Sequence, residues 1–524
     1  MSKYPSKITY SLLPLLSALL LAISWLYYDL LVFIALLPLF YFLKKCANKS
    51  EKSIVVFSML YLTYILFNAI SSFWIVNANT NGFLGIVVLN SVVLALPWII
   101  YWFYLKSRNS KYSFLVLILS WLSVEFLHNK WDLGFPMYSL GNFLNDTIEI
   151  IQFYEFTGLR GGTLLILITN YVIFLGLTSY KQYKAYIISF TLILLSLFSW
   201  SIYRFQSYEE KENPISVAVL HTFADVYTFK YNLSDTQLLK FYLESLKKMP
   251  GNIDLFILPE TAFPNMRWVE DLHINSTLSN LNSWLLENDI ASVISGSILN
   301  ELYYGESSDP AGTKYIENTN QFYYTYNSSF LLNAKNNLLR YRHKKYLVPF
   351  EETIPFSSKL SFLQELIPSL GNFKFAYKET NSNVFEFKSG KYIGNLICFE
   401  SLFFDLYREM SNKGVGLFSI ILNEGWYYNT NLTGAKSFHK IAKIKAIEFR
   451  KPILRSSNQG ISSTINQRGQ VINLTSTNKN NLLLDNVNYN TKATFYSIFG
   501  DFLGLVSLIL LPLILVKTKK IKTL

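Results

Sequence analysis

Residues 394–401, GNLICFES, form a short apolar run of strand type that ends in Cys398 and is followed two positions later by Glu400. A thiol at the end of a buried strand is held rigidly, and a nearby acid and base can make it a nucleophile. The alternative is an inert core cysteine, which is the commoner situation for this residue type. The stretch alone favours that alternative, and the rest of the chain reverses the preference.

The composition of the 524-residue chain indicates a membrane protein. Half of the residues are hydrophobic (51%), only 16% are charged, and the net charge is nevertheless +12. Apolar and basic character together are typical of a protein whose Lys and Arg residues lie in cytoplasmic loops. The sequence has no compact basic and aromatic face and no Gly-rich phosphate loop, so we expect no nucleic-acid or nucleotide partner.

Seven apolar segments follow one another in the first 204 residues, and an eighth covers 495–516. Spanning a bilayer takes about 20 apolar residues, so these segments are predicted membrane helices, of which the second, fifth and sixth are short. The first seven are 8–27, 30–43, 53–76, 82–105, 113–128, 164–179 and 185–203. The first is not expected to be a cleaved signal peptide, because further spans follow it at once and no small-residue cleavage pattern closes it.

Basic residues cluster in alternate loops. The clusters are Lys3 and Lys7; Lys44, Lys45, Lys49 and Lys52; Lys106, Arg108 and Lys111; Lys181 and Lys184; and Lys517, Lys519, Lys520 and Lys522. The positive-inside rule then predicts a cytoplasmic N-terminus and an external segment after the seventh span. We therefore expect three parts: a seven-helix membrane domain (1–204), an external domain (205–490), and a C-terminal helix with a basic cytoplasmic tail (491–524). Cys46 and Cys398 would lie on opposite sides and could not form a disulfide with each other.

Residues 205–490 alternate strand-like and helix-like runs, which predicts an α/β layered domain. The expected strands are 215–221, 254–259, 291–299, 322–332, 392–399, 417–423 and 452–456, and the expected helices are 235–249, 276–287 and 436–450. Polar runs rich in Asn, Ser and Thr, such as 304–320 and 475–481, are predicted surface loops.

Three stretches of this domain, each read as a strand end, carry chemical groups. Glu260 follows an apolar strand in LPETAFP, and a poorly solvated carboxylate there can exchange protons near neutral pH. Lys344 precedes the run LVPF in HKKYLVPFEE, where a fixed cation can stabilise an oxyanion. Taken alone, Glu260 could equally be a surface residue in a turn, and Lys344 alone would favour an ordinary solvated side chain. With Cys398 they make a base, an oxyanion stabiliser and a nucleophile, whereas no Cys–His pairing or metal-ligand spacing competes.

The order of these motifs resembles the nitrilase (carbon–nitrogen hydrolase) superfamily. With membrane spans before and after, the chain resembles the membrane branch of that superfamily, the apolipoprotein N-acyltransferases of the bacterial inner membrane. Further stretches resemble motifs of this branch: GFP at 134–136, TG at 157–158, NEGW at 423–426 and RSSNQG at 455–460. The chain departs from the family pattern at Leu258, Tyr346, Glu351 and Glu424, and none of these departures removes a member of the Glu-Lys-Cys set.

The resemblance implies a fold and a set of roles. The fold is an αββα nitrilase-like sandwich, here inserted between transmembrane helices seven and eight. The implied roles are as follows: Glu260 as general base, Lys344 as oxyanion cation, Cys398 as nucleophile, Glu352 and Glu400 as supporting acids, and Asn423, Trp426 and Arg455 as substrate-binding residues. No metal or cofactor is implied.

The implied reaction is acyl transfer through a Cys398 thioester. A membrane phospholipid gives the acyl chain, and the α-amine of a diacylglyceryl-cysteine apolipoprotein receives it in the last step of lipoprotein maturation. The implied setting is a multi-pass protein of the bacterial inner membrane, monomeric, with a periplasmic catalytic domain. The residues leave two alternatives open: a membrane-bound nitrilase-type amidase that releases the acyl group to water, and a non-catalytic scaffold or transporter, for which no paired mid-span charges are found.

Two other features have two interpretations each. The apolar stretch 357–373 could be a membrane-facing arm or lid, or an ordinary packed loop and helix. Glu125, near the outer end of the fifth span, could be functional or could reach the interface.

Overall fold

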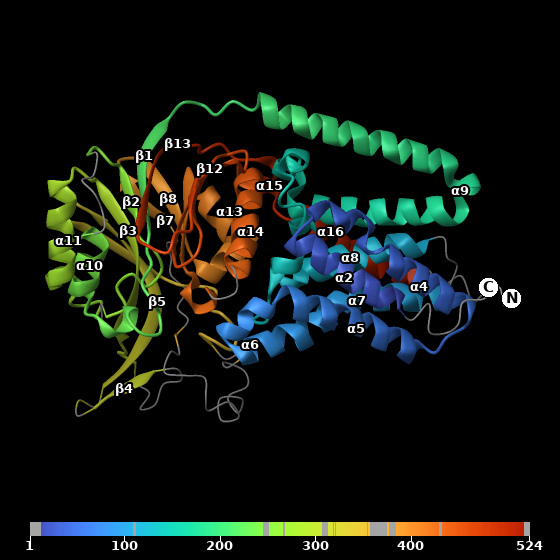
Figure 1. The fold of residues 1–524 in the computed structure, drawn as a ribbon, viewed down its shortest axis with the longest axis horizontal. Helices are drawn as coiled ribbons and strands as arrows, with labels where there is room; N and C mark the ends of the chain where they lie inside the picture. Colours follow the sequence, from blue (N-terminus) through green and yellow to red (C-terminus); the bar gives the residue numbers. More distant parts are fainter. Residues whose placement is uncertain are drawn as a thin grey trace. The chain divides into compact units, whose positions relative to one another are not determined.

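The computed structural model describes residues 12–107, 112–244, 251–265, 268–305, 313–317, 319, 321–353, 355–356, 375–376, 384–428 and 432–517. The chain divides into two compact units (Figure 1). The first comprises residues 1–208 and 499–524, and the second comprises residues 209–498. These limits fall a few residues after the expected ones at 204 and 490. The stretch 357–373 lies outside the described residues.

The first unit is helical. Its main helices are α2 (Leu13–Leu26), α3 (Val32–Ala35), α4 (Leu37–Asn48), α5 (Ser53–Ser71), α6 (Thr80–Gly85), α7 (Ser91–Ser107), α8 (Ser113–His128), α9 (Tyr154–Ser207) and α16 (Phe502–Lys517). Four helical stretches are long and apolar enough to cross a membrane: Asp29–Asn48, Ser53–Ser71, Thr80–Lys106 and Tyr154–Ser207. Three shorter apolar helices, Leu13–Leu26, Ser113–His128 and Phe502–Val516, coincide with other expected spans.

Helix α9 contains two of the expected spans. Its backbone leaves helical geometry at Ser179 (φ −154°, ψ 37°), and the helix doubles back there (Figure 1). The two ends are tied together: Arg204 Nε lies 2.9 Å from Glu155 Oε1, and the Gln152 backbone N–H donates to Ser201 Oγ at 2.7 Å. The predicted sixth and seventh segments are therefore two antiparallel limbs joined next to Lys181.

The second unit contains two β-sheets. The first sheet has the order β13-β1-β2-β3-β5-β4, with β6 also paired to β5, and the second has the order β12-β11-β10-β9-β8-β7. The strands of the first are β1 (Pro214–His221), β2 (Leu255–Ile257), β3 (Ser292–Leu302), β4 (Lys314–Ile316), β5 (Gln321–Asn333), β6 (Leu338–His343) and β13 (Asn481–Asn488). Those of the second are β7 (Val384–Lys388), β8 (Lys391–Ile397), β9 (Leu417–Asn423), β10 (Ile453–Asn458), β11 (Ser462–Ile465) and β12 (Val471–Thr475).

Four layers result, which confirms the predicted α/β sandwich. A buried apolar core joins the facing sides of the sheets, formed by alternate residues of strands such as Val217, Ile257, Ile397, Ile421 and Leu454. Helices α10 (Asp235–Glu244) and α11 (Ser276–Glu287) pack on the outer face of the first sheet (Figure 1).

The other outer face carries α13 (Phe404–Asn412) and α14 (Thr433–Phe449). Tyr407 of α13 and Phe449 of α14 pack on Phe418 of β9, with ring centroids 4.9 Å and 5.9 Å from it. Each helical layer therefore covers the sheet whose parallel strands its helices connect along the chain.

The strand directions decide where the chemistry lies. Strands β1, β2 and β3 are parallel, and so are β8, β9 and β10, so each set ends at one edge of its sheet. The two edges are joined where Thr222, just after β1, pairs with Asn458 at the end of β10. Groups that follow β2, β8 and β9 are thereby brought to one place.

Candidate active site

Glu260 lies just beyond β2 and is 5% exposed. Its Oε1 accepts hydrogen bonds from Lys344 Nζ (3.1 Å) and Asn327 Nδ2 (2.9 Å), and its Oε2 accepts one from the Asn423 backbone N–H (3.0 Å). The next residue, Thr261, has a φ of +47°. Gly296 makes this turn possible, because a Cβ there would lie 2.6 Å from the Glu260 Cα. The carboxylate is thus fixed from three sides.

Lys344 follows β6 and is buried between two carboxylates. Its Nζ lies 3.1 Å from Glu260 Oε1 and 2.9 Å from Glu352 Oε1. Burial lowers the pKa of this ammonium group, but the two carboxylates outweigh burial, and the net effect raises the pKa. Lys344 is therefore a permanent cation. The neighbouring Lys345 is a quarter exposed, with its Nζ 3.5 Å from Glu409.

Glu352 is tied to Glu260 through shared donors. Its Oε1 accepts from Lys344 Nζ and from Asn327 Nδ2 (2.8 Å), and its Oε2 accepts from the Val348 backbone N–H (2.8 Å). Asn327, on β5, donates to both carboxylates and was missed from the sequence. No local signal singles it out, because β5 also carries Thr325, Ser328 and Ser329.

Cys398 lies where β8 turns into a short 3-10 helix, Cys398–Leu402. Its φ is +50°, an uncommon conformation for a side chain other than glycine and one that often marks a functional site. Burial raises the pKa of the Cys398 thiol well above its ordinary value, Glu260 raises it further, and Lys344 opposes both effects. The resting thiol is therefore protonated at neutral pH, so a base must remove its proton before it can attack.

Glu400 has every oxygen engaged. It forms a bidentate ion pair with the Arg342 guanidinium (2.6 and 2.8 Å), and it also accepts hydrogen bonds from the backbone N–H groups of Lys345 and Ile397. Both side chains of the pair are fully buried. Glu400 therefore fastens the segment before Lys344 to the turn that carries Cys398. Arg342 was not singled out in the sequence.

The three expected substrate-binding residues have different surroundings. Asn423 holds Glu260 by its backbone, and its Nδ2 lies 3.5 Å from Thr261 Oγ1. Trp426 is half-buried and packs against Tyr231 at 5.8 Å and Tyr227 at 5.6 Å between ring centroids. These three rings form an aromatic group, of which Tyr231 lies close enough to Glu260 and Glu352 to interact with them electrostatically.

Arg455 has its ionic partner inside the domain. Its side chain is 1% exposed, and its guanidinium is paired with the buried Glu424 carboxylate. Glu424 also accepts hydrogen bonds from Ser457 Oγ (2.7 Å) and the Ile461 backbone N–H (3.0 Å). The expected role of Arg455 in substrate binding stays a prediction, and the contact observed in the structure is with a core carboxylate.

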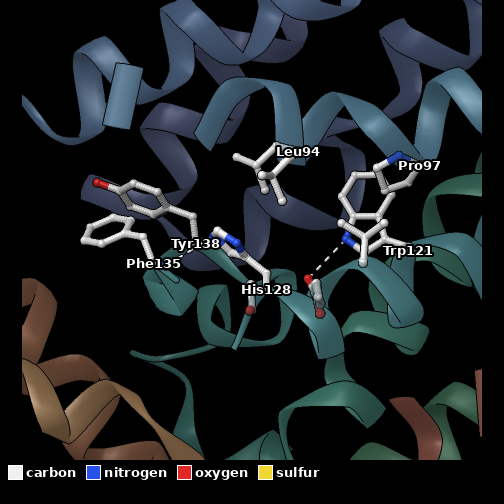
Figure 2. A pocket seen from close by; sticks show the side chains of 10 residues that line it. Leu94, Pro97, Trp121, His128, Phe135 and Tyr138 are labelled. Atoms are coloured by element: carbon white, nitrogen blue, oxygen red, sulfur yellow. Dashed lines mark hydrogen bonds between the residues drawn. The ribbon is translucent and has the colours of Figure 1, made fainter. Parts of the chain in front are cut away.

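Glu125, in the first unit, also proves to be a structural hub. Its four acceptor positions are taken by Trp121, the Leu140 backbone N–H, Thr163 and Arg160, at 2.8 to 3.1 Å. It lines a small pocket together with Trp121, His128, Phe135 and Tyr138, where Figure 2 shows the bond from Trp121 as a dashed line. The Glu125 carboxylate is thus buried and hydrogen-bonded on both oxygens within the helical unit.

The geometry in the second unit suits one kind of chemistry. A buried carboxylate, a fixed ammonium group and a protonated thiol can carry out acyl transfer through a covalent thioester. Within the described ranges, no three His, Cys, Asp or Glu residues are grouped so that they could hold a metal ion.

Comparison with known proteins agrees with this class. Residues 234–494 match the carbon-nitrogen hydrolase family, and residues 17–172 match the apolipoprotein N-acyltransferase N-terminal domain. The apolipoprotein N-acyltransferase of Chlorobaculum tepidum is 24% identical over 95% of this chain and 94% of its own length. The Treponema denticola apolipoprotein N-acyltransferase 1 is 26% identical over 96% and 95%, and the Geobacter metallireducens enzyme is 27% identical over 76% and 73%.

The second unit is thus a carbon–nitrogen hydrolase domain carried by a chain that also has apolar helices. The chain belongs to the apolipoprotein N-acyltransferase family and is an acyltransferase.

Proposed function

We propose that the protein transfers an acyl chain from a membrane phospholipid to the α-amine of a diacylglyceryl-cysteine apolipoprotein, by way of a thioester on Cys398. The observation that carries this proposal is the placement of the Lys344 ammonium group between Glu260 and Glu352, at the edge where Cys398 leaves β8. This arrangement provides a base and an oxyanion stabiliser for a thiol that is protonated at rest.

In the first half of the reaction, Glu260 takes the proton of the Cys398 thiol and the thiolate attacks the ester carbonyl of the phospholipid. Lys344 stabilises the oxyanion that forms. The ester C–O bond then breaks, and the lysophospholipid oxygen leaves with the proton held by Glu260. The acyl chain remains on sulfur, so the donor can depart before the acceptor arrives.

In the second half, the apolipoprotein amine attacks the thioester. An α-amine has a pKa near 8, so a modest fraction is nucleophilic at neutral pH. Glu260 takes the amine proton, Lys344 again stabilises the oxyanion, and the C–S bond breaks as Cys398 recovers its proton. Hydrogen bonds from Asn327 to both carboxylates and from Lys344 to Glu352 keep the Glu260 and Lys344 side chains in position in both halves.

The membrane setting is part of the proposal. The second unit lies on the periplasmic side of the bacterial inner membrane, between the seventh and eighth membrane helices, because Lys and Arg cluster in alternate loops. Both substrates are lipids, so a site at the membrane surface need not draw a whole acyl chain into water, which would cost about 0.8 kcal/mol per CH₂. We take the acting form to be a monomer.

The test is the mass of the intact protein after incubation with phospholipid alone. The mass should rise by one acyl chain, hydroxylamine should remove that chain, and a diacylated lipopeptide should receive it on its amine. Cys398→Ala should show no adduct, whereas Cys46→Ala, which removes a buried thiol on α4, should behave as wild type. Full turnover by Cys398→Ala would end the proposal, and discharge to water alone would indicate an amidase.

A further inference from the structure

A second lysine is buried beside Glu260. Lys230 lies in the short 3-10 helix Lys230–Asn232, and none of its side chain is exposed. Its Nζ donates to the backbone carbonyl of Glu260 at 3.1 Å and to Thr261 Oγ1 at 3.0 Å. Burial of a lysine is unfavourable unless its polar head is satisfied. No motif in the sequence singles out Lys230, and neither of its two bonds involves a carboxylate.

The two bonds hold a strained turn. Thr261 is β-branched and has a φ of +47°, a conformation that residues of this shape rarely adopt. Such a residue keeps this backbone only where its surroundings fix it. Lys230 binds the turn through the Glu260 carbonyl and the Thr261 hydroxyl, and Asn423 lies against the same hydroxyl at 3.5 Å. The orientation of the Glu260 side chain depends on this turn, because the side chain leaves the backbone directly before it.

Charge gives Lys230 a second role. Glu260 and Glu352 are both bonded to the Lys344 ammonium group, so two carboxylates share one cation before the thiol ionises. In its protonated form, Lys230 offsets part of that excess of negative charge, because its interaction with the Glu260 carboxylate is attractive. Burial lowers the pKa of Lys230 to about 7, and the Glu260 carboxylate opposes the decrease.

We propose that Lys230 is a positioning residue for acyl transfer, which holds the left-handed turn at Thr261 and thereby aims the Glu260 carboxylate at its partners. This inference rests on the proposed function, because it assigns Lys230 a part in setting the base of that reaction. The role of Lys230 is indirect, because its two hydrogen bonds are to the backbone and side chain of the turn.

The chain offers a matched control. Lys451 is 1% exposed, lies in the same unit, and donates to two backbone carbonyls, those of Asn490 (2.8 Å) and Lys492 (3.1 Å). Burial also lowers its pKa to about 7. Lys451→Met therefore removes an equally buried ammonium group that has no bond to the Glu260 turn.

The experiment compares Lys230→Met with Lys451→Met in the full-length protein in phospholipid vesicles. Acyl transfer from the vesicle phospholipid to a diacylated lipopeptide is followed over a range of donor concentrations. We expect Lys230→Met to lower kcat by about 10²-fold with little change in KM, because misplacement of a reacting group by about 1 Å has an effect of that size. Lys451→Met should keep the wild-type kcat at a similar loss of thermal stability.

A double-mutant cycle with Thr261→Gly isolates the positioning role. Glycine adopts a positive φ without strain, so Lys230→Met should lose less kcat in the Thr261→Gly background than in the wild type. Because Thr261→Gly also removes the hydroxyl that Lys230 bonds, that bond alone would couple the two substitutions in Tm, and the positioning role requires coupling in kcat. Equal effects in the two backgrounds, or a kcat for Lys230→Met that matches Lys451→Met, would overturn the inference. Absence of any acyl adduct on the wild-type protein would instead reject the proposed function.

Discussion

Replacement of Lys344 by alanine tests the centre of the proposed site. The substitution removes two charge-assisted hydrogen bonds, to Glu260 (3.1 Å) and Glu352 (2.9 Å), and leaves both carboxylates joined to the same Asn327 amide. Without the ammonium group, two like charges face each other across that amide, and the Glu260 carboxylate loses one of the donors that orient it. The base is thus less well placed at the same time as the oxyanion loses its cation.

The expected magnitude follows from these two losses. Removal of one oxyanion-stabilising donor costs at least about 10²-fold in rate, or about 2.7 kcal/mol in the activation free energy. Disruption of a buried ion pair also lowers the free energy of unfolding by roughly 3–5 kcal/mol. We therefore expect Lys344→Ala to acylate Cys398 at least about 10²-fold more slowly and to have a lower Tm.

The assay is single-turnover acylation of Cys398 by phospholipid, read as intact mass against time. The control is Lys345→Ala, because the interaction of Lys345 with Glu400 is made by its backbone N–H and survives the substitution. That variant should stay within a few-fold of wild type. Greater sensitivity at Lys345, or acylation by Lys344→Ala at the wild-type rate, would refute the assignment of the oxyanion cation.

Three further outcomes are expected. Arg342→Met should leave the buried Glu400 carboxylate without its cation and lower the free energy of unfolding by about 3–5 kcal/mol, seen as a lower Tm in detergent; an unchanged Tm would contradict the fastening role. In the folded protein the pKa of Lys451 is lowered from 10.5 to about 7, so between those pH values the unfolded chain binds more protons than the folded one. The free energy of unfolding should therefore rise with pH in this range, by at most about 1.4 kcal/mol per pH unit. Lys451→Met should reduce that slope, and an unaltered slope would count against a buried, titrating Lys451. Reporter fusions after Lys184 and within residues 209–498 should report opposite compartments, and a shared compartment would reject the topology.

Local sequence was enough to predict the α/β sandwich, many of its strands and the helical apolar segments. Hydrophobic period and length are local properties, so the apolar runs that became β1, β3, β5 and β9 could be recognised one at a time. Strands β4, β6, β7, β11, β12 and β13 were missed, and β4 falls inside the predicted loop 304–320. These strands lie at or near the margins of the two sheets, where a short run of mixed polarity cannot be distinguished locally from a loop.

The sequence by itself determined that a carboxylate, a lysine and a thiol follow separate strands, because motif residues and the ends of apolar runs are both local sequence patterns. Only the tertiary structure decided which polar groups hold them. Asn327 meets a carboxylate 67 positions away, and Lys230 meets a turn 30 positions away. The ion pair between Arg455 and Glu424 was likewise evident only in the tertiary structure. The physical reason is that a buried polar atom must form its hydrogen bonds with the groups that surround it in the folded domain. Which groups surround it depends on the pairing and register of strands that are far apart in the chain.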